Sequence, residues 1–291
     1  MTVSPNLRAI LAMVAAMGLL VASDSCMKLG LAYAPLFQLM AIRGLVSVTL
    51  CLVLIVALGQ AAQLPRMFNG WLAARGVLET VANIAFTSAL AFVAIADVTA
   101  IAQTCPLLVL LGAWAFRGEK LGLARGLLIL VGIAGALLVA QPGAGAASFY
   151  AMLAFLTPLA AAVRDLITPN APKDVPPLVA TLAVMVCLGA AGVIGMLAFN
   201  EPVTPVLPVW LLMGLAGAMS LAGHLLLYLA YRIGQARTVA PFMYSLTIWA
   251  VLSGLVLFGE IPNALAIAGM ALISATGLAI IWLDGRQRRE G

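Results

Sequence analysis

Long runs of apolar residues, separated by short groups of charged residues, prolines and glycines, fill almost the whole chain. An α-helix needs about 20 apolar residues to cross the roughly 30 Å hydrocarbon core of a bilayer. The spacing of the runs predicts ten such helices with short connections between them. Their expected ranges are 7–28, 36–58, 71–93, 97–116, 123–140, 148–168, 178–199, 207–231, 238–258 and 264–283. This pattern is typical of an all-α membrane protein.

Composition agrees with that prediction and excludes a water-soluble fold. Apolar residues make up 64% of the chain and charged residues 9%, whereas roughly 25% of the residues in a soluble protein are charged. The first run resembles a cleavable signal peptide, but the nine further runs favour an uncleaved first helix. The four cysteines lack CxxC spacing and are interpreted as packing residues. Because the chain has one histidine, we expect no metal site, and we expect no cofactor.

Basic residues gather in alternate connections, and this asymmetry orients membrane helices because basic loops stay in the cytoplasm. The termini and one set of connections hold Arg8, Arg66, Arg75, Arg117, Lys120, Arg125, Lys173, Arg232, Arg237, Arg286, Arg288 and Arg289. The other set holds at most Lys28. We therefore expect an inner (cytoplasmic) membrane protein with both termini in the cytoplasm. The net charge of +5 is too scattered to form a nucleic-acid-binding stripe.

The two halves of the chain resemble one another. Residues 89–99 match residues 228–238, and residues 116–119 match residues 257–260. Five helices per half is an odd number, so the second copy must enter the membrane from the opposite side, and the loop charges reverse accordingly. We expect inverted five-helix repeats over 1–143 and 144–285, followed by a short basic tail at 286–291. Inverted repeats provide two related conformations with a substrate site at their interface, which favours a transporter that works by alternating access.

Several short motifs occur in a characteristic order. They are Ala-x-x-Thr-Ala-Ile-x-Gln-Thr-x-Pro-Leu at 96–107, Arg-Gly-Glu-Lys at 117–120 before a glycine-rich helix at 122–135, Arg43, Thr-Val-Ala-Pro-Phe-x-Tyr at 238–244, and Phe-Gly-Glu at 258–260. The chain resembles the drug/metabolite transporter superfamily, in its ten-helix EamA-type branch. The resemblance implies a central cavity surrounded by spans one to four and six to nine. It also implies a substrate among amino acids, nucleobases, sugars, vitamins, S-adenosylmethionine or drugs.

Ionisable residues within the predicted spans are the first candidates for a substrate site, because each costs roughly 2.5 kcal/mol or more near the bilayer centre. Glu79 shares a helical stripe with Arg75 and Asn83. Glu79 binds a substrate amine or carries a proton, or else forms a structural ion pair with Arg75. Arg43 binds a substrate carboxylate, or ties its helix to Asp24.

The remaining polar candidates are distributed over four other spans. Asp24 and Ser25 line the outer part of the first span with Lys28, which either belongs to an outer gate or extends to the membrane surface. His224, a second candidate for proton coupling, shares a face with Tyr228, and packing is the alternative. Further candidates for substrate contact are Gln103, Thr104, Tyr244 and Trp249. Pro106, Pro158 and Pro241 are expected to break their helices. Arg164 and Asp165 are interpreted as anchors of the sixth span, and Glu119 and Glu260 as loop or cap residues.

Other function classes lack their characteristic motifs. No HExxH, GxSxG or Asp-rich motif indicates an intramembrane enzyme for lipid-linked substrates. Without a GxxxxGK loop, ATP is not the direct energy source, and neither a charge ring nor a filter repeat indicates a channel. We expect a secondary transporter or facilitator for a small polar or amphipathic metabolite, with export of an amino acid-like compound favoured. An importer or exchanger of a nucleoside-like or vitamin metabolite, such as an S-adenosylmethionine-like compound, is the alternative. The expected partners are the substrate and the bilayer, and the sequence leaves open proton coupling and the choice between monomer and homodimer.

Overall fold

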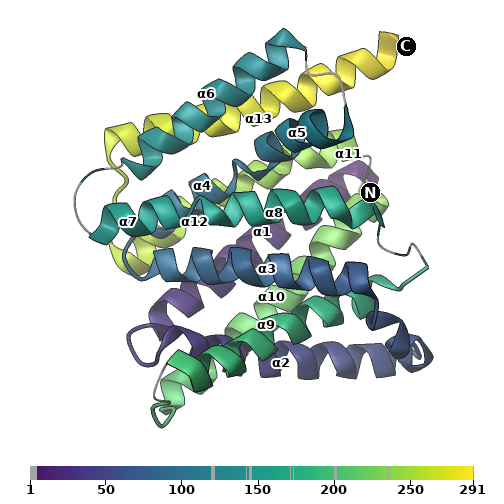
Figure 1. Cartoon of the computed structure of the whole chain (residues 1–291), viewed down its shortest axis with the longest axis vertical. Coiled ribbons are helices and arrows are strands. Elements are labelled where there is room, and N and C mark those ends of the chain that lie inside the picture. The colour runs from purple at the N-terminus through teal and green to yellow at the C-terminus, as the bar shows by residue number, and fades with distance from the viewer. Residues whose placement is uncertain are drawn as a thin grey trace.

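The computed structural model describes residues 5–118, 122–141, 143, 146–170, 172, 174–199, 202–234 and 236–290. All regular structure in these residues is helical (Figure 1). The elements are α1 (Pro5–Gly30), α2 (Leu36–Ala57), η1 (Ala61–Met67), α3 (Gly70–Leu90), α4 (Ile95–Ala102), α5 (Cys105–Arg117), α6 (Leu123–Ala140), α7 (Ala146–Leu153), α8 (Leu156–Ile167), η2 (Thr168–Asn170), α9 (Pro177–Phe199), α10 (Leu207–Ile233), α11 (Ala236–Val239), η3 (Ala240–Tyr244), α12 (Ser245–Ser253), η4 (Gly254–Phe258) and α13 (Ala264–Glu290).

Within the described ranges, nine helical stretches are long and apolar enough to cross a membrane. They are Pro5–Gly30, Leu36–Ala57, Ile95–Phe116, Leu123–Ala140, Ser148–Ile167, Pro177–Phe199, Leu207–Ala230, Ala240–Phe258 and Ala264–Leu283. Each coincides with a predicted span. The remaining predicted span is α3, a helix of 21 residues. It does not belong to the nine, because Arg75, Glu79 and Asn83 reduce its hydropathy. The chain is therefore an all-α, multi-pass membrane protein.

Three of the spans are interrupted, and a proline lies near each interruption. α4 ends at Ala102 and α5 begins at Cys105, directly before Pro106. α7 and α8 are separate helices, and Pro158 lies in the first turn of α8. Pro241 lies in η3, which precedes α12. Because proline has no N–H to donate, it leaves a carbonyl of the preceding turn without its helical partner. At the first break, the hydroxyl of Thr104 donates to the carbonyl of Ile101 at 2.7 Å.

Helices from the first half of the chain pack against helices from the second half. α1 packs against α10, α2 against α9, α3 against α8, α4 against α12, and α6 against α13. Glycines allow two of these pairs to approach closely. A Cβ atom on Gly44 would lie 2.4 Å from the Cα of Gly189, and one on Gly269 would lie 2.4 Å from the carbonyl oxygen of Gly135. The bundle is therefore held together by contacts between its two halves.

The helices run between two ends of the bundle. We call the terminal end the one where α1 begins and α13 ends, and the far end the one where α1 ends and α13 begins (Figure 1). At the far end, the side-chain amides of Gln141 and Asn263 exchange two hydrogen bonds of 2.8 and 3.1 Å. Gln141 caps the C-terminus of α6, so Leu123, the first residue of α6, and Asn263 lie at opposite ends of that helix.

The repeated Phe-x-Gly-Glu and Phe-Gly-Glu motifs end their spans in the same way. Gly118 follows α5 with φ 67°, and Gly259 follows η4 with φ 65°. Both glycines have the left-handed conformation that commonly terminates helices and that favours glycine. The sequence match between the two halves therefore coincides with a match in local backbone structure. Glu119, which follows Gly118, lies outside the described residues.

Candidate functional site

A polar cavity of about 200 Å³ lies in the interior of the bundle, among α1, α2, α3, α4, α8, α9, α10 and α12. We call it the central cavity. Its polar and charged lining residues are Ser23, Asp24, Arg43, Glu79, Asn83, Thr99, Thr157, Arg164, Ser220 and His224. Glu79 lies near the middle of α3, so the cavity is far from both ends of the bundle. The structure thus brings five of the predicted site residues to one place, namely Asp24, Arg43, Glu79, Asn83 and His224.

Arg43 and Asp24 both line this cavity, but their side chains do not bond directly to each other. Nη2 of Arg43 donates a hydrogen bond of 3.3 Å to the Ser220 hydroxyl, while Nη1 is buried without a hydrogen-bond partner. The Asp24 carboxylate interacts electrostatically with Arg43. Among the described residues, neither a hydrogen bond nor an ion pair joins the two side chains. One cationic and one anionic group are therefore available to a ligand.

Glu79 is engaged by Arg164 of α8 and not by Arg75. Arg164 forms an ion pair with the Glu79 carboxylate and a second one with Asp165, where the distance from Nη2 to Oδ1 is 2.7 Å. The alternative of an Arg75–Glu79 pair on one helix is therefore wrong for this conformation. Because α3 packs against α8, the guanidinium of Arg164 reaches Glu79 across the helix interface. Arg164 belongs to the cavity wall as well as anchoring its own span.

His224 lies beside the same group of charges. Its Nδ1 is 2.7 Å from the carbonyl oxygen of Ser220. A carbonyl only accepts hydrogen bonds, so Nδ1 carries the hydrogen and the neutral ring presents Nε2 as an acceptor. Ser220 therefore holds His224 through its carbonyl and Arg43 through its hydroxyl.

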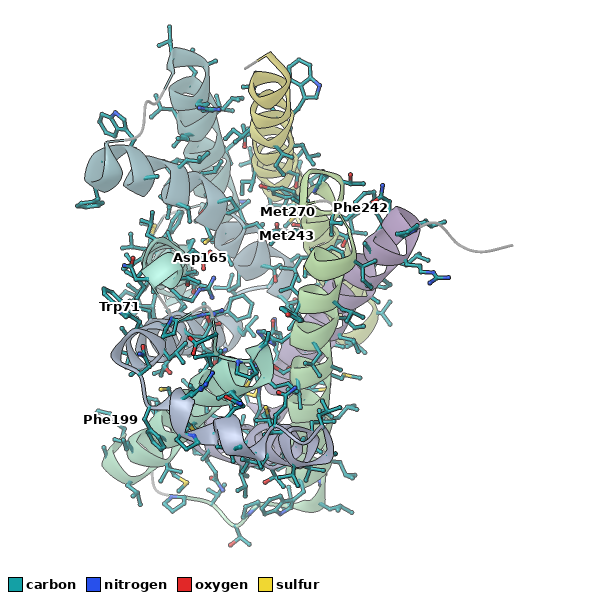
Figure 2. All side chains as sticks on the ribbon, turned by 90° about the vertical axis from the view of Figure 1, so that its right-hand side faces the viewer. Trp71, Asp165, Phe199, Phe242, Met243 and Met270 are labelled. Atoms are coloured by element: carbon teal, nitrogen blue, oxygen red, sulfur yellow. The ribbon has the colours of Figure 1, made fainter. Side chains whose placement is uncertain are left out.

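A second cavity, of about 490 Å³, adjoins the central cavity on the side of the terminal end. We call it the vestibule. It shares Glu79, Arg164 and His224 with the central cavity and is lined further by Arg75 and Tyr228, among others. Figure 2 looks onto the terminal end, where Asp165 of α8 lies above the first turn of α3, marked by Trp71. The Glu79–Arg164 pair consequently forms the partition between the two cavities.

An ion pair lies at the far end. Lys28, near the end of α1, contacts the Glu260 carboxylate, donates a hydrogen bond of 3.0 Å to the Val93 carbonyl, and lies 4.9 Å from the centre of the Phe258 ring. The other carboxylate oxygen of Glu260 accepts the backbone N–H of Ile95, at the start of α4, at 3.1 Å. Glu260 thus caps α4, and Lys28 is mostly buried, with 13% of its side chain exposed. Lys28 does not extend to the surface in this conformation.

Three further candidate residues join helices outside the two cavities. The hydroxyls of Ser25 and Ser253 lie 2.6 Å apart. The Gln103 amide donates to the Thr247 hydroxyl at 2.7 Å, and the indole of Trp249 donates to the Val14 carbonyl at 3.0 Å. A fourth candidate, Thr104, donates its hydroxyl hydrogen bond to the carbonyl of Ile101 in the same turn. None of these candidates lines the central cavity or the vestibule.

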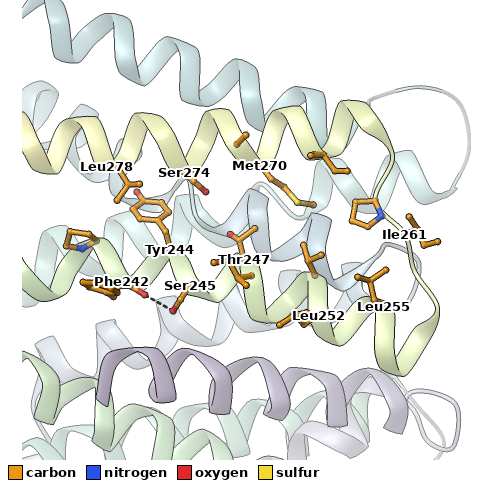
Figure 3. A pocket seen from close by; sticks show the side chains of 16 residues that line it. Phe242, Tyr244, Ser245, Thr247, Leu252, Leu255, Ile261, Met270, Ser274 and Leu278 are labelled. Atoms are coloured by element: carbon orange, nitrogen blue, oxygen red, sulfur yellow. Dashed lines mark hydrogen bonds between the residues drawn. The ribbon is translucent and has the colours of Figure 1, made fainter. Parts of the chain in front are cut away.

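Tyr244 lies in a third space, a groove of about 760 Å³ between α12 and α13 (Figure 3). Apart from the hydroxyls of Tyr244, Ser245, Thr247 and Ser274, its lining side chains are apolar. The Ser245 hydroxyl is already engaged by the Phe242 carbonyl at 2.7 Å. No charged side chain lines this groove, so it does not offer a site for a charged substrate despite its larger volume.

Comparisons with known proteins agree with this architecture. The EamA-like transporter family matches residues 7–141. The chain is 31% identical over 218 residues to a riboflavin transporter of Rhizobium johnstonii, which covers 74% of this chain and 71% of the relative. It is 28% identical over 213 residues to a pseudopaline exporter of Pseudomonas aeruginosa, and the alignment covers 71% of this chain and 72% of the relative. A riboflavin transporter of Vibrio cholerae is 28% identical over 235 residues, covering 76% and 74%.

A crystal structure of another protein shares the fold. It superposes with a TM-score of 0.64 over 96% of this chain and 98% of that chain, at 20% sequence identity. The relatives and the family are membrane transporters of small molecules. The chain therefore belongs to the EamA-like transporter family of the drug/metabolite transporter superfamily and is a multi-pass membrane transporter.

Proposed function

We propose that the protein transports a small, amino acid-like metabolite across an inner membrane by alternating access, with export as the favoured direction. The observation that carries this proposal is the presence of Arg43 and Asp24 in the central cavity, where Nη1 of Arg43 is buried without a hydrogen-bond partner. A guanidinium forms paired hydrogen bonds with a carboxylate, and a carboxylate accepts hydrogen bonds from an ammonium group. A zwitterionic α-amino acid head group supplies both.

The other charges of the cavity support this assignment. Glu79 and Arg164 neutralise each other, whereas Arg43 and Asp24 do so only at longer range. An incompletely paired charge within a membrane is costly, and such residues commonly mark substrate pathways. The central cavity of about 200 Å³ is also smaller than the roughly 300–1,000 Å³ of pockets for drug-sized ligands. A small head group suits that space, and a longer side chain would extend into the vestibule.

Ten spans arranged as two inverted repeats, over 1–143 and 144–285, are part of the proposal. The helix pairing supports them. When the second five spans are superposed on the first five, α8 takes the place of α1 and α10 takes the place of α3. The α1–α10 contact therefore corresponds to the α8–α3 contact. The contacts of α2 with α9, α4 with α12 and α6 with α13 each correspond to themselves. That is the pattern expected from a twofold relation between the halves. The left-handed glycines Gly118 and Gly259 add a local match.

Alternating access is supported by the difference between the two ends. The Lys28–Glu260 pair closes the far end, while the vestibule extends the central cavity toward the terminal end. With both termini placed in the cytoplasm by the basic residues, this conformation receives substrate from the cytoplasm, as an exporter requires. Glu79 and His224, the two candidates for proton coupling, lie where the cavities meet.

A vitamin-like substrate is the second candidate function. Its support is the identity of 31% to a protein named as a riboflavin transporter. The central cavity and the vestibule together offer more room than an amino acid needs. Because riboflavin carries no carboxylate, its transport would not depend on the charge of Arg43.

Flux measurements in proteoliposomes test both candidates. Radiolabelled amino acids, riboflavin and S-adenosylmethionine are offered to the wild type and to Arg43→Gln, Asp24→Asn and Arg66→Gln. Arg66 is the control, because it pairs with Asp174 at the surface, outside both cavities. We expect amino acid flux that Arg43→Gln and Asp24→Asn each reduce by about tenfold or more, the effect of losing one charge-assisted contact. Riboflavin flux that both substitutions leave unchanged, without amino acid flux, would favour the second candidate instead.

A further inference from the structure

Arg75 is a charged residue that the proposed central site does not use. It lies on α3, one helical turn nearer the terminal end than Glu79, and it lines the vestibule. Its Nε is buried and has no hydrogen-bond partner. Glu79, the acid one turn away, forms its ion pair with Arg164 of α8. Arg75 therefore interacts with Glu79 only at longer range.

Among the described residues, Arg75 is the charged residue of the vestibule that forms no ion pair. Its charged lining residues are Arg75, Arg164 and Glu79, and His224 is the remaining titratable nitrogen base. Glu79 is already paired with Arg164, and Arg164 is also paired with Asp165. A guanidinium in a partly buried position without a paired anion is unfavourable, because removal from water is not compensated. The guanidinium of Arg75, whose Nε is buried without a partner, therefore favours the binding of an anion in the vestibule.

The hydrogen-bond donors and the volume of the vestibule suit an organic carboxylate. Arginine presents donors in a planar fork that matches a carboxylate in bidentate fashion. Tyr228, which is 40% exposed, lines the same cavity and adds a hydroxyl donor. The volume of about 490 Å³ accommodates a whole amino acid outside the Glu79–Arg164 partition.

We propose that Arg75 forms a separate anion-binding station in the vestibule, where the substrate carboxylate docks before it reaches the central cavity. The proposal rests on the amino acid-like substrate inferred above. It assigns the two arginines different places on one path, with Arg75 on the terminal side of the partition and Arg43 beyond it. A zwitterion crosses the partition at low cost. Its ammonium group takes the place of Arg164 beside Glu79, and its carboxylate takes the place of Glu79 beside Arg164.

Cysteine protection measures occupancy of the two cavities separately. Two reporter cysteines are introduced into a background in which Cys26, Cys51, Cys105 and Cys187 are replaced by alanine. Thr181→Cys reports on the vestibule and Ala161→Cys on the central cavity, because each residue lines one cavity and not the other. The probes are L-alanine, propionate, which lacks the ammonium group, and L-alaninamide, which lacks the carboxylate.

We expect propionate and L-alanine to slow the modification of Thr181→Cys, and L-alaninamide not to. Arg75→Gln raises the concentration needed for protection about tenfold, as the loss of a charged hydrogen-bond partner does. Arg75→Lys has a smaller effect, because it keeps the charge and loses the fork. L-alanine still protects Ala161→Cys in Arg75→Gln, which shows that the variant is folded. Arg66→Gln is the matched control and leaves both protections unchanged.

The same chemistry would also bind the phosphate of a lipid. Detergent-solubilised protein is therefore compared with and without phosphatidylglycerol. If phosphatidylglycerol protects Thr181→Cys through Arg75 while propionate and L-alanine do not, the station binds lipid and the proposal is overturned. Propionate protection that Arg75→Gln leaves intact also overturns it. If L-alanine protects Ala161→Cys in no variant while propionate protects Thr181→Cys, the proposed substrate fails and the anion station stands.

Discussion

Glu79 of α3 pairs with Arg164 of α8, across the interface of two helices, although Arg75 lies four residues away on its own helix. The pair joins the two halves of the chain at the level where the central cavity meets the vestibule. Both side chains are mostly buried, with exposures of 20% for Arg164 and 23% for Glu79. This arrangement frees Arg75 to face the vestibule and leaves Arg43 and Asp24 for a ligand.

Glu79→Gln is expected to destabilise the protein, because it leaves Arg164 with only Asp165 as an anionic partner. Breaking a buried pair by removing one partner costs about 3–5 kcal/mol. The double variant Glu79→Gln with Arg164→Gln should recover part of that loss, since neither charge then remains unpaired. Thermal unfolding in detergent measures both effects. Additive losses in the double variant would show that the two side chains do not interact.

The Lys28–Glu260 pair is expected to hold the far end closed. Lys28→Met should increase the rate at which a reagent added at the far end modifies a cysteine at position 161, in the background without native cysteines. The exchange Lys28→Glu with Glu260→Lys should restore closure only in part, because Glu260 also accepts the N–H of Ile95. An unchanged rate in Lys28→Met would mean that the apolar contacts around Phe258 close this end without the ion pair.

Close contact between α2 and α9 should depend on Gly44. A Cβ atom there would lie 2.4 Å from the Cα of Gly189, so Gly44→Ala must push the two helices apart. We expect a lowered Tm, equivalent to about 1–3 kcal/mol as for other overpacked cores. Gly214→Ala in α10 is the matched control, since its Cβ would meet no atom within 4 Å. The control should keep or raise the Tm, because alanine favours helices over glycine.

Much of the fold follows from local sequence. Apolar runs of membrane length locate the spans, and nine of the ten expected spans coincide, within the described ranges, with helices long and apolar enough to cross a membrane. α3 departs from that rule because it carries Arg75, Glu79 and Asn83. Glu79 and Arg43 are candidates on the principle that ionisable residues within apolar runs are costly, and both line the central cavity.

The ion-pair partners of the buried charges could not be predicted from the spacing of residues along one helix. The Arg75–Glu79 pair, one alternative offered by the sequence, is replaced by Glu79–Arg164, and Lys28 pairs with Glu260; both pairs join residues far apart in the sequence. Arg164 lines both cavities, and its position within the apolar run 148–168 was the sequence signal that could have pointed to them. Tyr244 and Trp249, which the sequence offers as substrate contacts, lie outside both cavities: Tyr244 lines the groove between α12 and α13, and Trp249 donates to the Val14 carbonyl.

Loop labelling is expected to place residues 122 and 263 on opposite sides of the membrane. They flank α6 at its two ends, since Gly122 precedes the helix and Asn263 contacts its C-terminal cap. Single cysteines at these positions, treated with an impermeant reagent in intact cells, should react from opposite faces. Reaction of both from one face would contradict the inverted arrangement of the halves.

The direct test of the central claim is the affinity of the protein for an amino acid relative to its amide. Dissociation constants of L-alanine and L-alaninamide are measured by calorimetry for wild type and Arg43→Gln. If Arg43 binds the substrate carboxylate, the wild type prefers L-alanine by about tenfold or more, and Arg43→Gln loses that preference. Equal affinities in the wild type, or a preference that persists in Arg43→Gln, would contradict the account.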